Sequence, residues 1–218
     1  MSVRIHAWGD LACFTRPEMS AERTSFDVIT PSAARGVVEA IYWKPEIRWH
    51  IDRIHVLRPI RFTSIRRNEV GSKIPAGAVT AAMKSGRGRL GLNIEEDRQQ
   101  RAALVLRDVG YVIEAHFRIV GGEANPAKHL DQFNRRARVG GCYARPFLGC
   151  REFLAEFALI EDGEPLPEVD PELQGTRDLG FLLHDIDFED GMKPHFFHAV
   201  LHDGVLDVPR WPGRRDRP

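Results

Sequence analysis

The sequence predicts an α+β protein built on a ferredoxin-like domain, a split βαβ arrangement that RNA-recognition modules share. Candidate elements follow in the order strand, helix, strand, strand, hairpin insertion, helix and strand over residues 1–160. Both helices carry clear start and stop signals, and the strands show alternating hydrophobicity. A small antiparallel β region over residues 161–209 and a disordered tail over residues 210–218 are expected to follow. Fold alone does not give function.

The first expected strand covers residues 3–8, and the first expected helix covers residues 30–44. Thr30 is a suitable N-cap, Pro31 suits the first helical position, and Pro45 ends the pattern. Four apolar residues at helical spacing predict one buried stripe on this helix. These residues are Ala34, Val37, Val38 and Ile41.

Arg35, Glu39 and Tyr42 are expected to share the flank beside that stripe, because a helix turns by about 100° per residue. A guanidinium, a carboxylate and a phenol would then lie together at the edge of a core helix. The alternative is a boundary tyrosine beside an ordinary surface ion pair.

Further strands are expected over residues 48–57, where the alternation is imperfect, and over residues 60–67. Residues 71–91 are rich in glycine and basic side chains and contain no acidic residue. They are interpreted as a mobile cationic loop, which suits contact with backbone phosphates or is simply solvated. Residues 101–107 and 110–120 are interpreted as a hairpin with a short turn between them.

The second helix is expected over residues 125–138, with Asn125 as cap and a basic C-terminal end. A strand over residues 150–160 follows, and the last strands are expected over residues 179–188 and 195–206. The histidines of the last expected strand would share one face and could form a metal cluster only in a helix, but the pattern of this segment is β-like. No metal and no cofactor are expected.

Composition indicates a packed protein of one large or two small domains. The sequence contains no stretch of about 18 apolar residues, so no membrane-spanning segment is predicted. The N-terminal residues lack the apolar core of a signal peptide, and Cys13, Cys142 and Cys150 are an odd number without close metal-type spacing. A reduced cytoplasmic protein is therefore expected.

The net charge of zero conceals an asymmetry between two parts of the chain. Residues 1–150 carry 24 Lys and Arg against 15 Asp and Glu, whereas residues 151–218 carry 7 against 16. The basic part is expected to attract a polyanion such as nucleic acid, and the acidic part is expected to face solvent or a protein partner. Random surface charge is the alternative.

Four segments resemble those of one family. Residues 30–45 resemble the signature helix of the CRISPR-associated endoribonuclease of subtype I-C systems, the d variant of the fifth Cas family within the repeat-associated (RAMP) superfamily. Residues 140–153, 179–188 and 196–209 resemble three further signatures. The resemblance covers nearly the whole chain, with the segments in the same order.

The resemblance implies a function. Such proteins bind the repeat hairpin of CRISPR precursor RNA, cut at the 3′ base of its stem without a metal, and leave a 5′ handle on each guide RNA. They then remain on the handle as a subunit of the surveillance complex. The expected partners are therefore the precursor or guide RNA and the other subunits of the type I-C complex.

The resemblance also assigns site residues. The family's catalytic tyrosine falls on Tyr42 and its catalytic histidine on His116, but the lysine of its Lys-His pair falls on Ala115. By strand alternation, Ala115 faces away from His116 and Arg118. Arg118, or less directly Lys44, is therefore the candidate for the missing cationic role.

The chemistry of metal-free RNA cleavage fits these residue types. The 2′-hydroxyl attacks the adjacent phosphate, so a base takes its proton, an acid protonates the leaving 5′-oxygen, and a cation stabilises the phosphorane. The expected product is a 2′,3′-cyclic phosphate. Histidine suits the proton transfers, and tyrosine can orient the hydroxyl or act as a base where cations lower its pKa. The candidate RNA-binding residues are Arg35, Arg66, Arg67, Lys73, Lys84, Arg87, Arg89, Arg135 and Arg136.

Two alternatives remain open. A non-catalytic subunit that only caps the 5′ handle would explain Ala115, whereas Tyr42 with His116 favours the enzyme. A generic RNA-recognition domain would place exposed aromatic residues on its central strands. Tyr111 and Phe117 have suitable positions, but they share a strand face with isoleucines and are expected in the core.

Overall fold

The computed structural model describes residues 2–19, 21–88, 90–121, 125–188 and 190–210, and it confirms the α+β class. The strands in this part of the chain are β1 (Ser2–Ala12), β2 (Ile47–Val56), β3 (Phe62–Val70), β4 (Arg98–Ile119), β5 (Glu156–Leu159), β6 (Thr176–Asp187), β7 (Lys193–His202) and β8 (Val205–Asp207). The helices are α1 (Pro31–Ile41), α2 (Ala76–Ser85) and α3 (Pro126–Arg138).

The strands form one sheet in the order β5-β1-β4-β2-β8-β7-β6, in which the strand pairs are antiparallel. Strand β4 separates β1 from β2, and β1 separates β4 from β5. The units β1-α1-β2 and β4-α3-β5 therefore interlock as two split βαβ units, which is the predicted ferredoxin-like plan.

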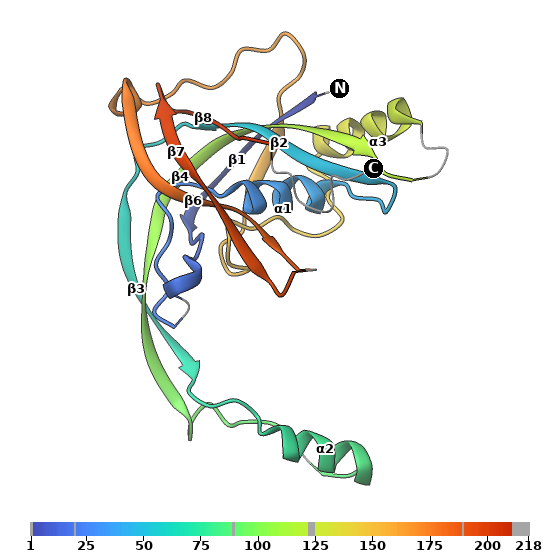
Figure 1. The fold of residues 1–218 in the computed structure, drawn as a ribbon, viewed down its shortest axis with the longest axis vertical. Coiled ribbons are helices and arrows are strands. Elements are labelled where there is room, and N and C mark those ends of the chain that lie inside the picture. The colour runs from blue at the N-terminus through green and yellow to red at the C-terminus, as the bar shows by residue number, and fades with distance from the viewer. Residues whose placement is uncertain (1, 20, 89, 122–124, 189, 211–218) are drawn as a thin grey trace.

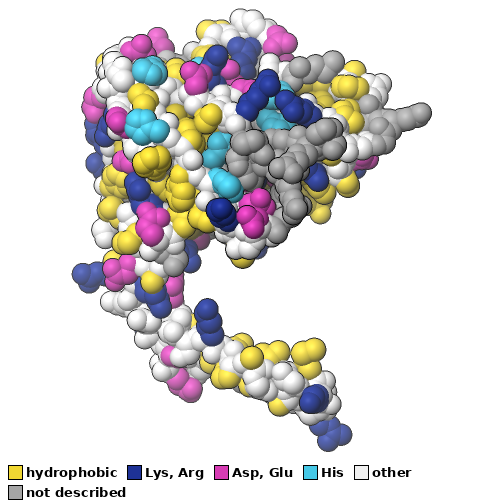
Figure 2. All heavy atoms as spheres, viewed as in Figure 1, with side chains coloured by type: hydrophobic (Ala, Val, Ile, Leu, Met, Phe, Trp, Pro, Cys, Tyr) yellow, Lys and Arg dark blue, Asp and Glu magenta, His cyan; other side chains and the backbone are white. Residues whose placement is uncertain are grey.

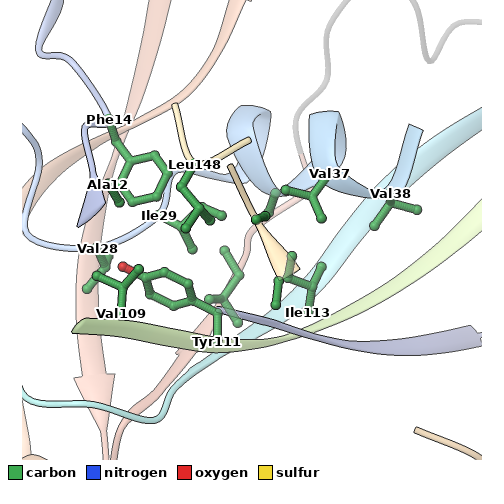
Figure 3. Close-up of a cluster of buried hydrophobic side chains, with 14 of the residues drawn as sticks. Ala12, Phe14, Val28, Ile29, Val37, Val38, Val109, Tyr111, Ile113 and Leu148 are labelled. Carbon is green, nitrogen blue, oxygen red and sulfur yellow. The ribbon is translucent and has the colours of Figure 1, made fainter. Parts of the chain in front are cut away.

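The core lies where α1 packs on the sheet. Val37 and Val38 of α1 point toward Ile113 of β4, while Tyr111 and Phe14 fill the neighbouring space (Figure 3). All five side chains are at most 3% exposed. Burial of this apolar surface is the main stabilising contribution to the fold.

An arm projects from the body of the molecule (Figure 1). Strand β3 pairs with residues 98–106 of β4, and α2 lies at the far end of this two-stranded ribbon. The interpretation of residues 71–91 as an unstructured loop is therefore wrong in part. Residues 76–85 are rich in alanine, which favours helix, and Gly86 ends α2 in the left-handed conformation with φ of 61°.

Strand β4 is continuous over 22 residues, so the predicted hairpin turn between residues 107 and 110 is wrong. Its first half pairs with β3 and its second half lies between β1 and β2. Asp108, at a φ of 52°, marks the place where the pairing changes from β3 to the central sheet. Local polarity indicated a turn, but long-range pairing on both sides keeps the strand extended.

The last strands extend the main sheet. The predicted strand over residues 195–206 divides into β7 and β8 at a two-residue turn, in which Asp203 and Gly204 have φ of 51° and 80°. A side chain at Gly204 would also collide with Val169, whose Cγ1 lies 2.6 Å from the Cβ position. Leucines of β6, β7 and β8 join the same hydrophobic core as β1. The domain boundary at residue 160 remains a prediction.

Three smaller differences affect the predicted elements. Helix α1 ends at Ile41, three residues earlier than predicted, and Tyr42 has extended backbone angles. The strand expected over residues 150–160 is limited to β5, and β1 continues four residues beyond Trp8. Of the predicted disordered tail, residues 211–218 lie outside the described residues.

Candidate active site

A cavity of about 290 Å³ lies along residues 48–52 of β2. Strand β8 pairs with the residues that follow, Arg53–His55, so the cavity begins where this pairing ends. Strand β4 contributes His116 and Arg118 to the cavity, α1 contributes Pro31, Arg35 and Glu39, and the C-terminal region contributes His184 and residues 208–210.

His116 lies on the face of β4 that points away from α1 and α3. It pairs across the sheet with His50, and the two rings stack with centroids 5.1 Å apart and planes 15° apart. About a quarter of the His116 side chain is exposed. The His50 ring therefore covers one face of the His116 ring, and the edge of the His116 ring remains accessible from the cavity.

Asp52 contacts the same imidazole. Both of its carboxylate oxygens lie 2.8 Å from Nδ1 of His116, which donates to them. The backbone amide of Val208 donates to the Asp52 carbonyl at 3.0 Å and fixes the main chain at this point. With Nδ1 bound to the carboxylate, Nε2 is the ring nitrogen suited to exchange a proton with a substrate.

Arg118 provides positive charge beside His116. It lies two residues further along β4, on the same face, and pairs across the sheet with Arg48. Both arginines line the cavity. Lys44 is exposed in the segment between α1 and β2 and is not a lining residue of this cavity. Ala115 is fully buried on the opposite face, as strand alternation predicts.

Tyr42 occupies a different environment. Its side chain is 1% exposed, and its hydroxyl lies 2.9 Å from Nδ1 of His129 on α3. Trp49 donates from Nε1 to the Tyr42 carbonyl at 2.8 Å, and the Arg136 guanidinium lies 5.3 Å from the centre of the phenol ring. Burial raises the pKa of Tyr42 above its ordinary value, and the nearby Arg136 offsets this only in part. The phenol is therefore protonated at neutral pH.

The structure does not bring Tyr42 and His116 together. Phe117 packs against both Trp49 and His129, so its side chain lies on the same side of the sheet as Tyr42. His116 precedes Phe117 and points to the other side. The expected flank of Arg35, Glu39 and Tyr42 is also not formed, because Tyr42 lies beyond the end of α1.

Three of the predicted RNA-binding residues make contacts within the protein. Arg35 forms a two-point ion pair with the buried Asp185 and lies 3.7 Å from Glu39. Arg136 donates to the Ile41 carbonyl at 3.1 Å and thereby satisfies an acceptor at the end of α1. Arg67 binds Glu152 and lies 3.6 Å from Glu69.

The other predicted RNA-binding residues lie at the surface. Arg66, Lys73, Lys84 and Arg87 are exposed along the arm, and Arg135 is exposed on α3. Figure 2 shows Lys and Arg side chains at the tip of the arm. Arg89 lies outside the described residues.

The described residues show neither a metal cluster nor a membrane helix. In those parts of the chain, no three His, Cys, Asp or Glu side chains form a group that could hold a metal ion. None of the helices there has the length and apolar character needed to cross a membrane. Cys13, Cys142 and Cys150 are free thiols.

Sequence reasoning missed Asp52, His50 and Arg48 as members of this site. Their roles depend on which residues of β2 lie opposite His116 and Arg118, and this register is set by contacts over 60 residues apart in sequence. One local signal was present, since the imperfect alternation over residues 48–57 reflects a bulge between Ile51 and Arg53.

Comparisons with known proteins agree with this fold. The family model for Cas5d, described as CRISPR-associated protein (Cas_Cas5), matches residues 2–209. A protein of Mannheimia succiniciproducens named CRISPR pre-crRNA endoribonuclease Cas5d is 58% identical over 95% of this chain and 94% of its own. A protein of Thermus thermophilus with the same name is 39% identical over 95% of this chain and 91% of its own.

Solved structures show the same fold at lower identity. A crystal structure of a CRISPR-associated protein is 24% identical, with a TM-score of 0.70 over 96% of this chain and 92% of the other. A functionally uncharacterized protein of Streptococcus mutans gives 0.66 at 22% identity, over 96% and 93% of the two chains. A chain of a CRISPR RNA-guided surveillance complex gives 0.50 at 14% identity, over 99% and 95%. On the family match and the two relatives, the chain belongs to the Cas5d family of CRISPR-associated proteins.

Proposed function

We propose that this protein is a metal-independent endoribonuclease that binds and cleaves the repeat hairpin of CRISPR precursor RNA, and then remains on the 5′ handle as a subunit of the surveillance complex. Two relatives over most of the chain are named CRISPR pre-crRNA endoribonucleases. The observation that carries the proposal is the position of His116, with Arg118 and Arg48 beside it, at a cavity large enough to admit part of a nucleotide.

The residues at this cavity can perform the steps of the reaction. In the proposed mechanism, Nε2 of His116 exchanges a proton with the reacting oxygens. It either takes the proton of the attacking 2′-hydroxyl while solvent protonates the leaving 5′-oxygen, or protonates the 5′-oxygen while solvent takes the proton of the 2′-hydroxyl. The phosphorus–5′-oxygen bond breaks as the 2′-oxygen bonds to phosphorus, which leaves a 2′,3′-cyclic phosphate. Arg118 stabilises the negative charge of the phosphorane, in place of the lysine for which this chain has Ala115.

The basic arm supports binding of the rest of the RNA. Its exposed cations, Arg66, Lys73, Lys84 and Arg87, extend away from the cavity and can neutralise backbone phosphates. Arg135 on α3 provides a further exposed cation. Because backbone contacts position a nucleic acid without reading its sequence, we assign these residues to affinity and orientation.

A second candidate is a non-catalytic subunit that caps the 5′ handle of the guide RNA. Two points favour it: the resemblance places Ala115, which is fully buried, at the position of the family's lysine, and the Tyr42 hydroxyl is bound to His129 on the far side of the sheet from His116. Either function places the protein with its RNA in the cytoplasm.

Cleavage of a labelled repeat hairpin in excess EDTA tests the proposal. We expect wild type to make a single cut, and His116→Ala to cut at least about 100-fold more slowly, because general acid–base catalysis contributes factors of this size. His198→Ala is the matched control, since His198 also contacts an aspartate, Asp178, at 2.9 Å but lies on β7 away from the cavity.

The products decide between the two candidates. A 2′,3′-cyclic phosphate end from wild type and His198→Ala, together with loss of the cut in His116→Ala, supports the enzyme. Tight, salt-sensitive binding by wild type without any cut would contradict it and identify a handle-binding subunit.

A further inference from the structure

A bulge in β2 places Asp52 against His116. Pairing between β2 and β4 matches Ile51 with Ala115, so an uninterrupted strand would place Asp52 opposite Glu114. Two carboxylates directly opposite each other would repel. The register instead shifts, so that Arg53 pairs with Glu114 and their side chains lie 3.5 Å apart. Asp52 becomes the extra residue of the bulge, and its carboxylate reaches His116.

The contact restrains the imidazole in a defined way. The His50 ring stacks on His116 and restricts the tilt of its plane, while the two Asp52 oxygens at 2.8 Å restrict rotation within that plane. A carboxylate accepts hydrogen bonds but donates none when ionised, so it requires a proton on Nδ1. Nε2 is then the nitrogen that lacks the proton in the neutral ring.

The bulge itself relieves repulsion between Asp52 and Glu114, but stability does not account for the contact between Asp52 and His116. The Asp52 side chain is 44% exposed and that of His116 is 26% exposed, and ion pairs at such positions contribute little to folding. The bulge also removes one residue from the regular pairing of the strand. The effect of the contact is therefore on the ring itself, through its tautomer and its orientation at the cavity.

We propose that Asp52 is a positioning residue that holds His116 in the Nδ1–H tautomer and directs Nε2 toward the scissile phosphate. This inference rests on the proposed function, because the tautomer matters only where His116 exchanges protons with RNA. Arg48, Arg118 and Glu39 also line the cavity, but Asp52 is the carboxylate that contacts the His116 ring, so it also balances positive charge when the imidazolium forms.

The test compares Asp52→Asn, Asp52→Glu and Asp178→Asn with wild type. An asparagine can turn its amide toward Nδ1 and impose the wrong tautomer, so we expect the single-turnover cleavage rate of Asp52→Asn to fall at least about tenfold. Asp52→Glu retains a carboxylate on a longer side chain and should recover part of that loss. Asp178→Asn removes the carboxylate from the separate Asp178–His198 pair and should cleave like wild type.

A second readout measures the ring directly. In ¹⁵N spectra of the histidine side chains, assigned with His116→Ala, we expect the neutral His116 ring to carry its proton on Nδ1 in wild type and to lose this preference in Asp52→Asn. A fold defect alone would not change the tautomer selectively, and hairpin binding with unchanged affinity shows that Asp52→Asn retains its fold.

The outcomes separate this inference from the proposed function. If wild type cleaves and Asp52→Asn cleaves equally well with the same tautomer, the positioning role is overturned and the endoribonuclease stands. If wild type does not cleave, both fall. Slower cleavage by Asp52→Asn with an altered tautomer supports the inference.

Discussion

At the scale of single residues, Tyr42 shows how one side chain can stabilise two helices. Its hydroxyl bonds to His129 of α3 at 2.9 Å, while its ring lies beneath Arg136, which in turn binds the last turn of α1. A buried tyrosine normally has such a partner, since an unpaired buried hydroxyl is costly. The contacts give Tyr42 a structural role, and its catalytic role remains a prediction.

Tyr42→Phe distinguishes these roles. The substitution leaves Nδ1 of the buried His129 without its partner, so we expect the free energy of unfolding to fall by about 1–3 kcal/mol. Cleavage by the folded variant should stay close to wild type, because the hydroxyl lies on the other side of the sheet from His116. Urea unfolding and single-turnover cleavage at 25 °C measure the two effects separately.

The pH dependence of unfolding provides a control for the same variant. Burial raises the pKa of Tyr42 in the folded state, so its contribution to stability is complete below the unfolded value of about 10 and declines as pH rises through the folded value. Wild type should therefore lose more stability than Tyr42→Phe between pH 9 and pH 11. A large loss of cleavage with unchanged stability would instead show a catalytic phenol.

At the scale of elements, β4 contributes both to the arm and to the cavity. The 22-residue strand carries Arg101 within the arm and His116 within the central sheet, so one continuous backbone connects the arm to the cavity. Ion pairs strengthen the ribbon of the arm, where Glu69, near the end of β3, lies within 3.8 Å of Arg23, Arg67 and Arg101. The arm is therefore a supported extension of the sheet rather than an isolated hairpin.

A charge-neutralising variant tests the arm as an RNA contact. Replacing Lys73, Lys84 and Arg87 with alanine should reduce the slope of log affinity against log salt concentration by about two, because each lost phosphate contact contributes about 0.7–0.9. Filter binding of the repeat hairpin at several salt concentrations measures this slope.

The matched control replaces Arg151, Arg177 and Lys193, which are exposed cations outside the arm. It removes the same charge and should change the slope less than the arm variant. Equal slopes for the two triple variants would show that the arm attracts RNA only through the overall charge of the protein.

Elements with strong local signals could be predicted from the sequence. Caps and prolines located α1 and α3 to within a few residues, because these signals act on the backbone beside them. The continuity of β4 and the division between β7 and β8 depend on partners elsewhere in the chain, so local patterns gave a false turn at Asp108 and missed a real one at Asp203. Local patterns also could not predict Asp52 as a site residue, because its proposed role depends on the register between β2 and β4.

At the scale of the whole molecule, the basic and acidic parts compensate each other. Arg53 binds Asp207 at 2.8 Å, Arg61 binds Glu172 at 3.0 Å, and Arg35 binds Asp185. The sequence alone indicated that the acidic part would face solvent or a partner protein. Several of its carboxylates instead face arginines of the first part.

The Arg35–Asp185 pair should be the most important of these contacts. Asp185 is 3% exposed, and Asp185→Asn removes the two-point ion pair with Arg35 while Glu39 stays 3.7 Å from the same guanidinium, so we expect a loss of about 1–3 kcal/mol in the free energy of unfolding. Arg138 and Glu161 form an exposed pair that also connects the two parts, and Glu161→Gln should lower the free energy of unfolding much less than Asp185→Asn does, because solvent screens exposed ion pairs. Equal losses in urea unfolding would contradict a special role for Asp185.

The order of strands in the sheet determines when the protein can fold during its synthesis. Ser2 of β1 pairs with His116, and Arg53 of β2 pairs with Asp207, so both early strands depend on partners that the ribosome produces much later. Such distant pairings make folding slow. A nascent chain that has reached residue 160 still lacks the strand that borders the end of the cavity. The site therefore forms only after translation is nearly complete, and a truncated product would expose unpaired strand edges rather than a partly active enzyme.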